Sequence, residues 1–140
     1  MLPDWYWQYR DKLIANIDLD EAYEYALIHD CGKPYCLTID ADGKRHFPDH
    51  AEISYQTYLN IGGSQKIANL IRHDMDIHQL KADGVEEFCK NPNAALHLLA
   101  GLAEINSNAE HCGGFESISF KIKYKALCQR GKAICKVLYR

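Results

Sequence analysis

Histidine and aspartate side chains recur at the ends of predicted helices in the first half of the chain. His29 and Asp30 are adjacent in "ALIHDCGKPY", where an apolar run meets a Gly-Lys-Pro turn. Later helix ends carry His50 and the pair His73 and Asp74. Imidazole and carboxylate ligands together suit Mn, Fe, Co, Ni or Zn. Such an ion lowers the pKa of a bound water, which then becomes a nucleophile near neutral pH. Because helix ends can converge on one cleft, these residues predict a centre for one or two divalent transition-metal ions.

Hydrophobic periodicity predicts the elements that position these residues in the first half of the chain. Four helices are expected to begin near Pro3, Asp20, Pro48 and Ser64. Asp20 is the expected N-cap of the second helix, and Ser64 is that of the fourth. Residues 35–47 separate the second helix from the third. They read as a small hairpin-like excursion that turns at Asp42-Gly43.

The second half of the chain is also predicted to be helical. A short helix is expected at 85–89, and Asn91-Pro92 is expected to cap and open a long core helix. The stretch "ISFKIKYKAL" alternates apolar and polar residues like a strand, but no partner strand is evident, so we predict a helix over 117–126. The sequence therefore predicts an all-α, compact single-domain bundle over 1–140, with a small β excursion near 36–47.

Composition narrows the classes of protein to consider. The chain has 140 residues and a formal net charge of -3, but Ser117 to Arg140 hold seven Lys or Arg and no acidic residue. Such a basic end can meet an anionic partner. No apolar run suggests a secretory signal or a membrane span, so we expect no membrane association. The six cysteines form no C-x-x-C pair and are expected to be reduced thiols in a cytoplasmic protein.

Three segments, in this order, resemble the HD-domain phosphohydrolase superfamily. "ALIHDCGKP" is similar to the family's "LLHDIGKP" segment, "DGKRHFPDHAEIS" to its following loop and "GHE" helix start, and "IANLIRHDMDIH" to its "HDLIH" or "RHH" helix. The closest likeness is to the HD domain attached to bacterial tRNA nucleotidyltransferases. The resemblance implies an all-α bundle of the HD-domain type that binds one or two divalent ions and hydrolyses phosphoesters.

Carried over by position, the resemblance implies a set of metal ligands, namely His29, Asp30, His50, His73 and Glu104. Two departures from the family's pattern are present. No histidine precedes His29, and Glu104 stands where the family has a late aspartate. Asp30 and Lys33 are the predicted catalytic residues. Lys33 and Arg72 are the predicted contacts to a substrate phosphate, with a solvated turn lysine and a surface salt bridge as their respective alternatives.

The functional hypothesis is a metal-dependent hydrolase, either a phosphomonoesterase or a phosphodiesterase. It would act on a phosphorylated small molecule such as a nucleotide, or on a nucleic-acid end, through a metal-bound hydroxide. The alternative is a catalytically degraded HD domain that binds nucleotide or nucleic acid without turnover. The missing upstream histidine is the feature that favours this alternative.

Overall fold

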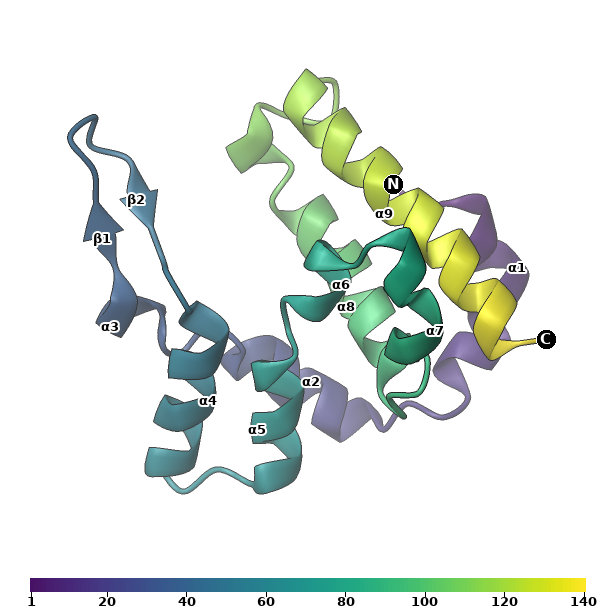
Figure 1. Cartoon of the computed structure of the whole chain (residues 1–140), viewed down its shortest axis with the longest axis horizontal. Helices are drawn as coiled ribbons and strands as arrows, with labels where there is room; N and C mark the ends of the chain where they lie inside the picture. The colour runs from purple at the N-terminus through teal and green to yellow at the C-terminus, as the bar shows by residue number, and fades with distance from the viewer. The chain divides into compact units, whose positions relative to one another are not determined.

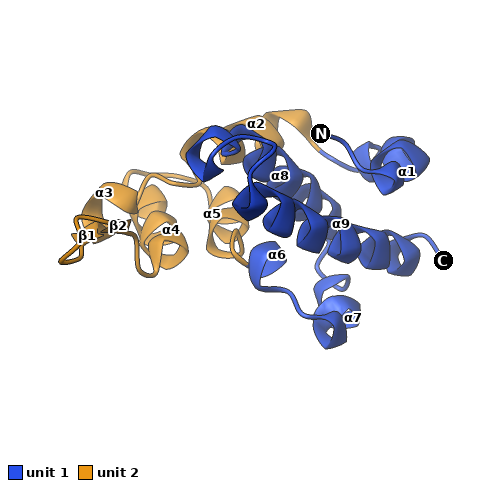
Figure 2. Cartoon of the chain, turned by 90° about the horizontal axis from the view of Figure 1, so that it is seen from above, with its two compact units in different colours: residues 1–17, 76–140 blue, residues 18–75 orange.

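The computed structural model describes residues 1–140 as a mainly helical chain with one small antiparallel hairpin (Figure 1). The predicted all-α fold with a β excursion is therefore confirmed. The backbone divides into two compact units, which are coloured separately in Figure 2. Unit 1 comprises Met1–Ile17 and Asp76–Arg140, and unit 2 comprises Asp18–Met75. No helix of the chain is both long enough and apolar enough to span a bilayer.

Unit 1 is built around its C-terminal helix, against which α1, α7 and α8 pack. Its elements in chain order are α1 (Asp4–Ile14), α6 (Asp76–Gln79), η1 (Ala82–Gly84), α7 (Val85–Phe88), α8 (Ala94–Ser107), η2 (Glu110–Cys112) and α9 (Ile118–Leu138). Fully buried side chains from several of these helices form its core, among them Leu13, Ile77, Leu98, Phe120, Leu127 and Ile134.

The helix predicted over the alternating stretch is confirmed, and α9 continues to Leu138. Phe120 and Leu127 are fully buried, whereas Ile118 and Ile122 are 78% and 64% exposed. The alternation in the sequence is therefore not the pattern of burial, which follows the helical period through Gly131 and Ile134. Ser117 caps the helix by accepting a hydrogen bond from the Phe120 amide.

Unit 2 consists of short helices and the hairpin. Its elements are α2 (Leu19–Ile28), α3 (Lys33–Cys36), β1 (Thr38–Ile39), β2 (Arg45–His46), α4 (His50–Asn60) and α5 (Gln65–Arg72). Helix α5 packs against α2 and α4, and α3 packs against α4. The two strands pair antiparallel, and Gly43 adopts a positive φ of 78° in the turn that the sequence predicted. Buried residues of α5 supply most of the apolar core, namely Ile67, Ala68, Leu70 and Ile71.

Two predicted helix starts are wrong by about half a turn. Helix α2 is capped by Asp18 instead of Asp20, because the Asp18 carboxylate accepts hydrogen bonds from the amides of Asp20 and Glu21. Helix α8 begins at Ala94, because the Asn91 side chain binds the Asn93 amide and folds the preceding residues into a turn. The other predicted starts in the first half of the chain hold: α1 begins directly after Pro3, α4 begins at His50, and Ser64 caps α5.

Candidate metal centre

The turn after α2 is held against α4 by one glycine and one serine. The Gly32 amide donates to Ser54 Oγ at 2.9 Å, and Ser54 is fully buried. A Cβ atom on Gly32 would overlap the backbone of Ile53 and Ser54 in α4. The Cys31 thiol also lies 3.4 Å from the carbonyl oxygen of Ser54. This close approach fixes the end of α2 beside the start of α4, and so brings Asp30 near His50.

His29 is oriented by its own helix. Its Nδ1 lies 2.9 Å from the carbonyl oxygen of Ala26, one turn earlier in α2. Its Nε2 lies 3.4 Å from Oδ2 of Asp30. The ring of Tyr25 packs against the imidazole with a centroid separation of 5.8 Å. Three contacts therefore define the direction in which His29 presents its second nitrogen.

His50 is held in the same way at the start of α4. Its Nδ1 lies 3.2 Å from the carbonyl oxygen of Phe47, and its Nε2 lies 4.0 Å from Oδ1 of Asp30. The preceding residue, Asp49, has a left-handed backbone with φ of 53°. Only a few per cent of residues other than glycine adopt this conformation, and aspartate is among those that do so most readily. The sharp entry into α4 turns His50 toward the end of α2.

These contacts indicate which tautomer each ring adopts in its neutral form. A carbonyl oxygen only accepts hydrogen bonds, so the Nδ1 atoms of His29 and His50 must carry the protons. In the neutral imidazole, Nε2 is then a lone-pair donor. Histidine ligands of metals are typically fixed by such a bond from the other nitrogen to a carbonyl or carboxylate. Two Nε2 lone pairs and the Asp30 carboxylate therefore face one another.

Asp74 completes the cluster from the turn after α5. Ligand atoms of His29, Asp30 and Asp74 all lie within 4.8 Å of one another. Asp74 is only 5% exposed, and the hydroxyl of the buried Tyr25 donates to its Oδ1. Burying a carboxylate is costly unless hydrogen bonds or cations compensate it. The Tyr25 hydroxyl provides part of that compensation, and its ring also contacts His29.

Lys33 lies at the edge of the cluster. Its Nζ is 2.6 Å from Oδ2 of Asp30 and 5.5 Å from the centre of the Phe47 ring. The side chain is about one-third exposed, so it can turn outward to another anion. Of the predicted phosphate contacts, Lys33 is the one that the structure places beside Asp30.

Three predicted site residues lie outside this cluster. His73 is the exposed C-terminal cap of α5, while its neighbour Asp74 is the one that turns inward. The Arg72 guanidinium binds both oxygens of Glu52, with the shorter distance 2.7 Å, and lies 4.6 Å from the Tyr55 ring centre. Glu104 belongs to α8 of unit 1, where it lies 2.9 Å from Nε2 of His78.

A second histidine–aspartate pair in unit 2 provides a useful contrast. Nε2 of His46 lies 2.8 Å from Oδ2 of Asp40 in the exposed hairpin. The hydrogen bond from His46, followed by those from the backbone, lowers the pKa of the Asp40 carboxyl below its ordinary value. This pair makes a direct hydrogen bond. The longer separations around Asp30 are not hydrogen bonds by the usual distance criterion.

Sequence reasoning placed Asp74 among the histidines and aspartates of interest but did not choose it as a ligand. The missing signal was burial. Asp74 follows Leu70 and Ile71, which are both buried, and the turn after α5 keeps it on the inner side of the unit. Residue type and spacing do not predict which of His73 and Asp74 is buried. The residues at the end of a helix can point either inward or outward.

Comparisons of this chain with models of protein families, with curated proteins and with solved structures find no match.

Proposed function

We propose that unit 2 binds a divalent transition-metal ion through His29, Asp30, His50 and Asp74 and hydrolyses a phosphate ester. The observation that carries the proposal is the convergence of two Nε2 lone pairs on the Asp30 carboxylate. In this proposal the chain is a distant relative of the HD-domain phosphohydrolases, which its three segments resemble.

The donor set fits an ion of the Mn, Fe, Co, Ni or Zn group, because mixed imidazole and carboxylate ligands are typical of these metals. Metal–ligand bonds of about 2.0–2.2 Å leave neighbouring donor atoms roughly 3–3.5 Å apart. The 3.4 Å between Nε2 of His29 and Oδ2 of Asp30 is in that range. The 4.0 Å between Nε2 of His50 and Oδ1 of Asp30 exceeds that range, so binding of one ion by both residues requires His50 to move closer to Asp30.

Each side chain of the cluster would have a different role in phosphoester hydrolysis. An ion bound there would lower the pKa of a water and draw charge from a phosphate oxygen. Asp30 holds the negative charge that favours the ion, and Tyr25 keeps Asp74 oriented within the buried part of the site. Lys33 would leave Asp30 and contact a phosphate oxygen of the substrate, where its ammonium group stabilises developing negative charge.

The substrate class in this proposal is a nucleotide or a phosphorylated nucleic-acid end. The position of Lys33 beside Asp30 supports a phosphate group in the substrate. The excess of basic residues from Ser117 to Arg140 supports an anionic partner. Turnover is the expected outcome. Binding without turnover remains the competing function, because this chain has no histidine before His29.

The experiment is a hydrolysis screen of the purified chain with added Mn²⁺, Co²⁺ or Ni²⁺. The panel comprises nucleoside monophosphates, cyclic phosphodiesters and oligonucleotides phosphorylated at either end. We expect hydrolysis of at least one class, and a loss of kcat of at least about 100-fold in Asp30→Asn. A wild-type rate in Asp30→Asn would overturn the metal mechanism.

His46→Gln is the matched control, since His46 also pairs with an aspartate of unit 2 but lies in the exposed hairpin. This variant is expected to keep the wild-type rate, while His29→Gln and His50→Gln lose it. Metal binding without hydrolysis of any panel member would support the alternative of a binding domain.

A further inference from the structure

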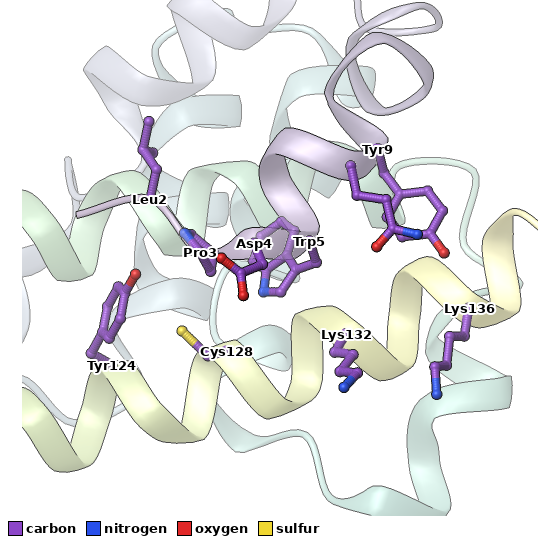
Figure 3. Close-up of a pocket in the computed structure, with 10 residues that line it drawn as sticks. Leu2, Pro3, Asp4, Trp5, Tyr9, Tyr124, Cys128, Lys132 and Lys136 are labelled. Atoms are coloured by element: carbon purple, nitrogen blue, oxygen red, sulfur yellow. The ribbon is translucent and has the colours of Figure 1, made fainter.

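Unit 1 contains a groove that the metal centre does not use. It lies where α1 runs along α9 and has a volume of about 590 Å³ (Figure 3). Small-molecule sites typically have about 300–1,000 Å³. Side chains from the start of α1 and from one face of α9 line it, among them Asp4, Trp5, Gln8, Tyr9, Lys132 and Lys136.

The floor of the groove is aromatic and rigidly packed. Trp5 is 4% exposed and lies over Gly131, where a Cβ atom would overlap the indole. Tyr9 stacks on Tyr139 with ring centres 5.5 Å apart. Tyr124 stacks on Phe120 at 5.6 Å. The buried indole N–H of Trp5 has no hydrogen-bond partner. Aromatic walls of this kind favour a planar ring as ligand.

Two lysines on α9 give the groove its charge. Lys132 and Lys136 are one helical turn apart, both are exposed, and neither forms an ion pair within the chain. Like charges at this spacing repel each other and destabilise a helix slightly. Two other bases of α9 are already engaged, since Lys121 pairs with Glu116 and Arg130 donates to the carbonyl oxygen of Leu80. An anion between the two lysines would offset their repulsion.

The α1 side of the groove offers a different set of polar groups. Asp4 supplies a carboxylate that accepts hydrogen bonds, and Gln8 supplies an amide that both donates and accepts. A glutamine amide can form two hydrogen bonds with the amino group and ring nitrogen of adenine. Burial raises the pKa of Tyr124 to about 12, so its hydroxyl keeps its proton at neutral pH. The groove therefore pairs a ring-recognising side with an anion-recognising side.

We infer that this groove binds a mononucleotide with an amino-bearing base, its ring against Tyr9 and its phosphate at Lys132 and Lys136. The volume suits one nucleotide. The charges match, because both unpaired lysines line one edge of the groove while Asp4 and Gln8 line the α1 side. The site is independent of the proposed hydrolase function, since every lining residue belongs to unit 1.

The test uses the full chain carrying Asp30→Asn in the presence of EDTA, so that the metal centre cannot respond. Adenosine monophosphate is titrated by isothermal calorimetry. We expect saturable binding of one nucleotide per chain with a Kd below about 1 mM. Adenosine, inorganic phosphate and uridine monophosphate are each expected to bind at least about tenfold more weakly. Equal binding of inorganic phosphate, or of uridine monophosphate, would overturn the inference of a site for an amino-bearing nucleotide.

The variant Lys132→Gln/Lys136→Gln is expected to weaken binding by about tenfold or more. Its matched control is Lys121→Gln/Lys125→Gln, which removes the same charge at the same spacing from α9 outside the groove. The control should bind as the parent chain does. If both double variants weaken binding equally, the effect is general electrostatics and the groove is not the site.

A second readout does not depend on substitutions in the groove. In Trp7→Phe, Trp5 is the only remaining tryptophan, and it lies in the groove. Its emission should change with adenosine monophosphate and saturate at the calorimetric Kd. No change in Trp5 emission over the calorimetric binding range would contradict binding in this groove.

Discussion

In His29 and His50, Nδ1 donates a hydrogen bond to a backbone carbonyl oxygen. The lone pair of each Nε2 atom is then directed at Asp30. The exposed pair of His46 and Asp40 shows the alternative, a direct hydrogen bond of 2.8 Å within a hairpin. The difference between the two arrangements is one of geometry and not of composition. A sequence predicts that histidine and aspartate are neighbours, but the hydrogen bond of each ring nitrogen depends on the fold.

The sequence alone did not determine which of His73 and Asp74 faces the cluster. The segment "IRHDMD" offers a histidine and an aspartate side by side, and the resemblance favoured the histidine. In the structure the aspartate is buried and joins His29 and Asp30, whereas His73 is exposed. The buried hydroxyl of Tyr25 provides the partner that makes the burial of Asp74 tolerable.

In the proposed site, Lys33 would compete with the metal ion for Asp30. Its replacement by methionine separates the effect of Lys33 on metal affinity from its effect on substrate binding. Lys33→Met removes an ion pair of 2.6 Å, so the affinity for Mn²⁺ should rise by a few-fold, or about 1 kcal/mol at most. The same change would also remove the phosphate contact that we propose for Lys33, so KM for a phosphorylated substrate should increase. Metal titration and steady-state kinetics measure the two effects. Weaker metal binding together with an unchanged KM would show that Lys33 supports the metal site and does not bind substrate.

At the scale of elements, one close contact aligns the site. Gly32 allows the turn after α2 to touch the backbone of α4, and Ser54 bonds its amide. The sequence predicted a turn at Gly32, and in the structure this residue follows the end of α2 at Ile28 and is the N-cap of α3. The sequence did not show that the glycine is also required by the approach of another helix. Gly32 and Ser54 are more than twenty positions apart in the chain, so local sequence patterns cannot predict that they are in contact.

Gly32→Ala should therefore destabilise the chain by about 1–3 kcal/mol, because the new methyl group overlaps backbone that cannot move without shifting α4. Metal affinity should fall as well, since Asp30 and His50 separate. Gly84→Ala is the matched control. Gly84 has φ of -89° and ψ of -5°, close to the -86° and -13° of Gly32. Its nearest obstacle is the flexible Leu80 side chain, so little change is expected.

Chemical denaturation and metal titration of both variants test this assignment. Equal loss of stability in the two alanine variants would mean that the backbone preference of glycine, and not the contact with α4, is what matters.

Helix α9 shows why a pattern alone was ambiguous. Four alternating apolar residues suggested a strand, but the decisive observation was the absence of a partner strand. The structure agrees, since Phe120 and Leu127 bury one side of a helix while Ile118 and Ile122 stay exposed. The helix is fixed by its packing against α1, α7 and α8. Packing between elements decides such cases, and local alternation does not.

At the scale of the whole molecule, the chain divides into two compact units, and each contains one of the two proposed sites. Unit 2 holds the histidine–aspartate cluster, and unit 1 holds the groove between α1 and α9. Composition gave no linker or change of character that would mark the division, since unit 1 combines both ends of the chain. The prediction of one domain over 1–140 rested on length and stays a prediction, because one domain can contain two compact units.

The stability of the folded molecule should fall at alkaline pH because of two groups on α9. Burial raises the pKa of Cys135 from 9.0 to about 12 and that of Tyr124 from 10.0 to about 12. The unfolded chain therefore releases these protons at lower pH than the folded chain, so it binds fewer protons in this range. The free energy of unfolding must then decrease as pH rises from about 9 to about 12.

Thermal unfolding at a series of alkaline pH values measures this effect. Tyr124→Phe removes one of the two groups and should lose less stability over the same range than the parent chain does. An identical pH dependence in the two proteins would exclude Tyr124 as a contributor.

The central claim is that His29, Asp30, His50 and Asp74 form a metal site, and metal content after loading tests it most directly. The chain is incubated with Mn²⁺ or Zn²⁺, desalted, and analysed by plasma mass spectrometry alongside Asp30→Asn and His46→Gln. We predict about one ion per chain in the parent and in His46→Gln, and less than about one-tenth of that in Asp30→Asn. Equal metal content in the parent and in Asp30→Asn, or none in the parent, would contradict the claim.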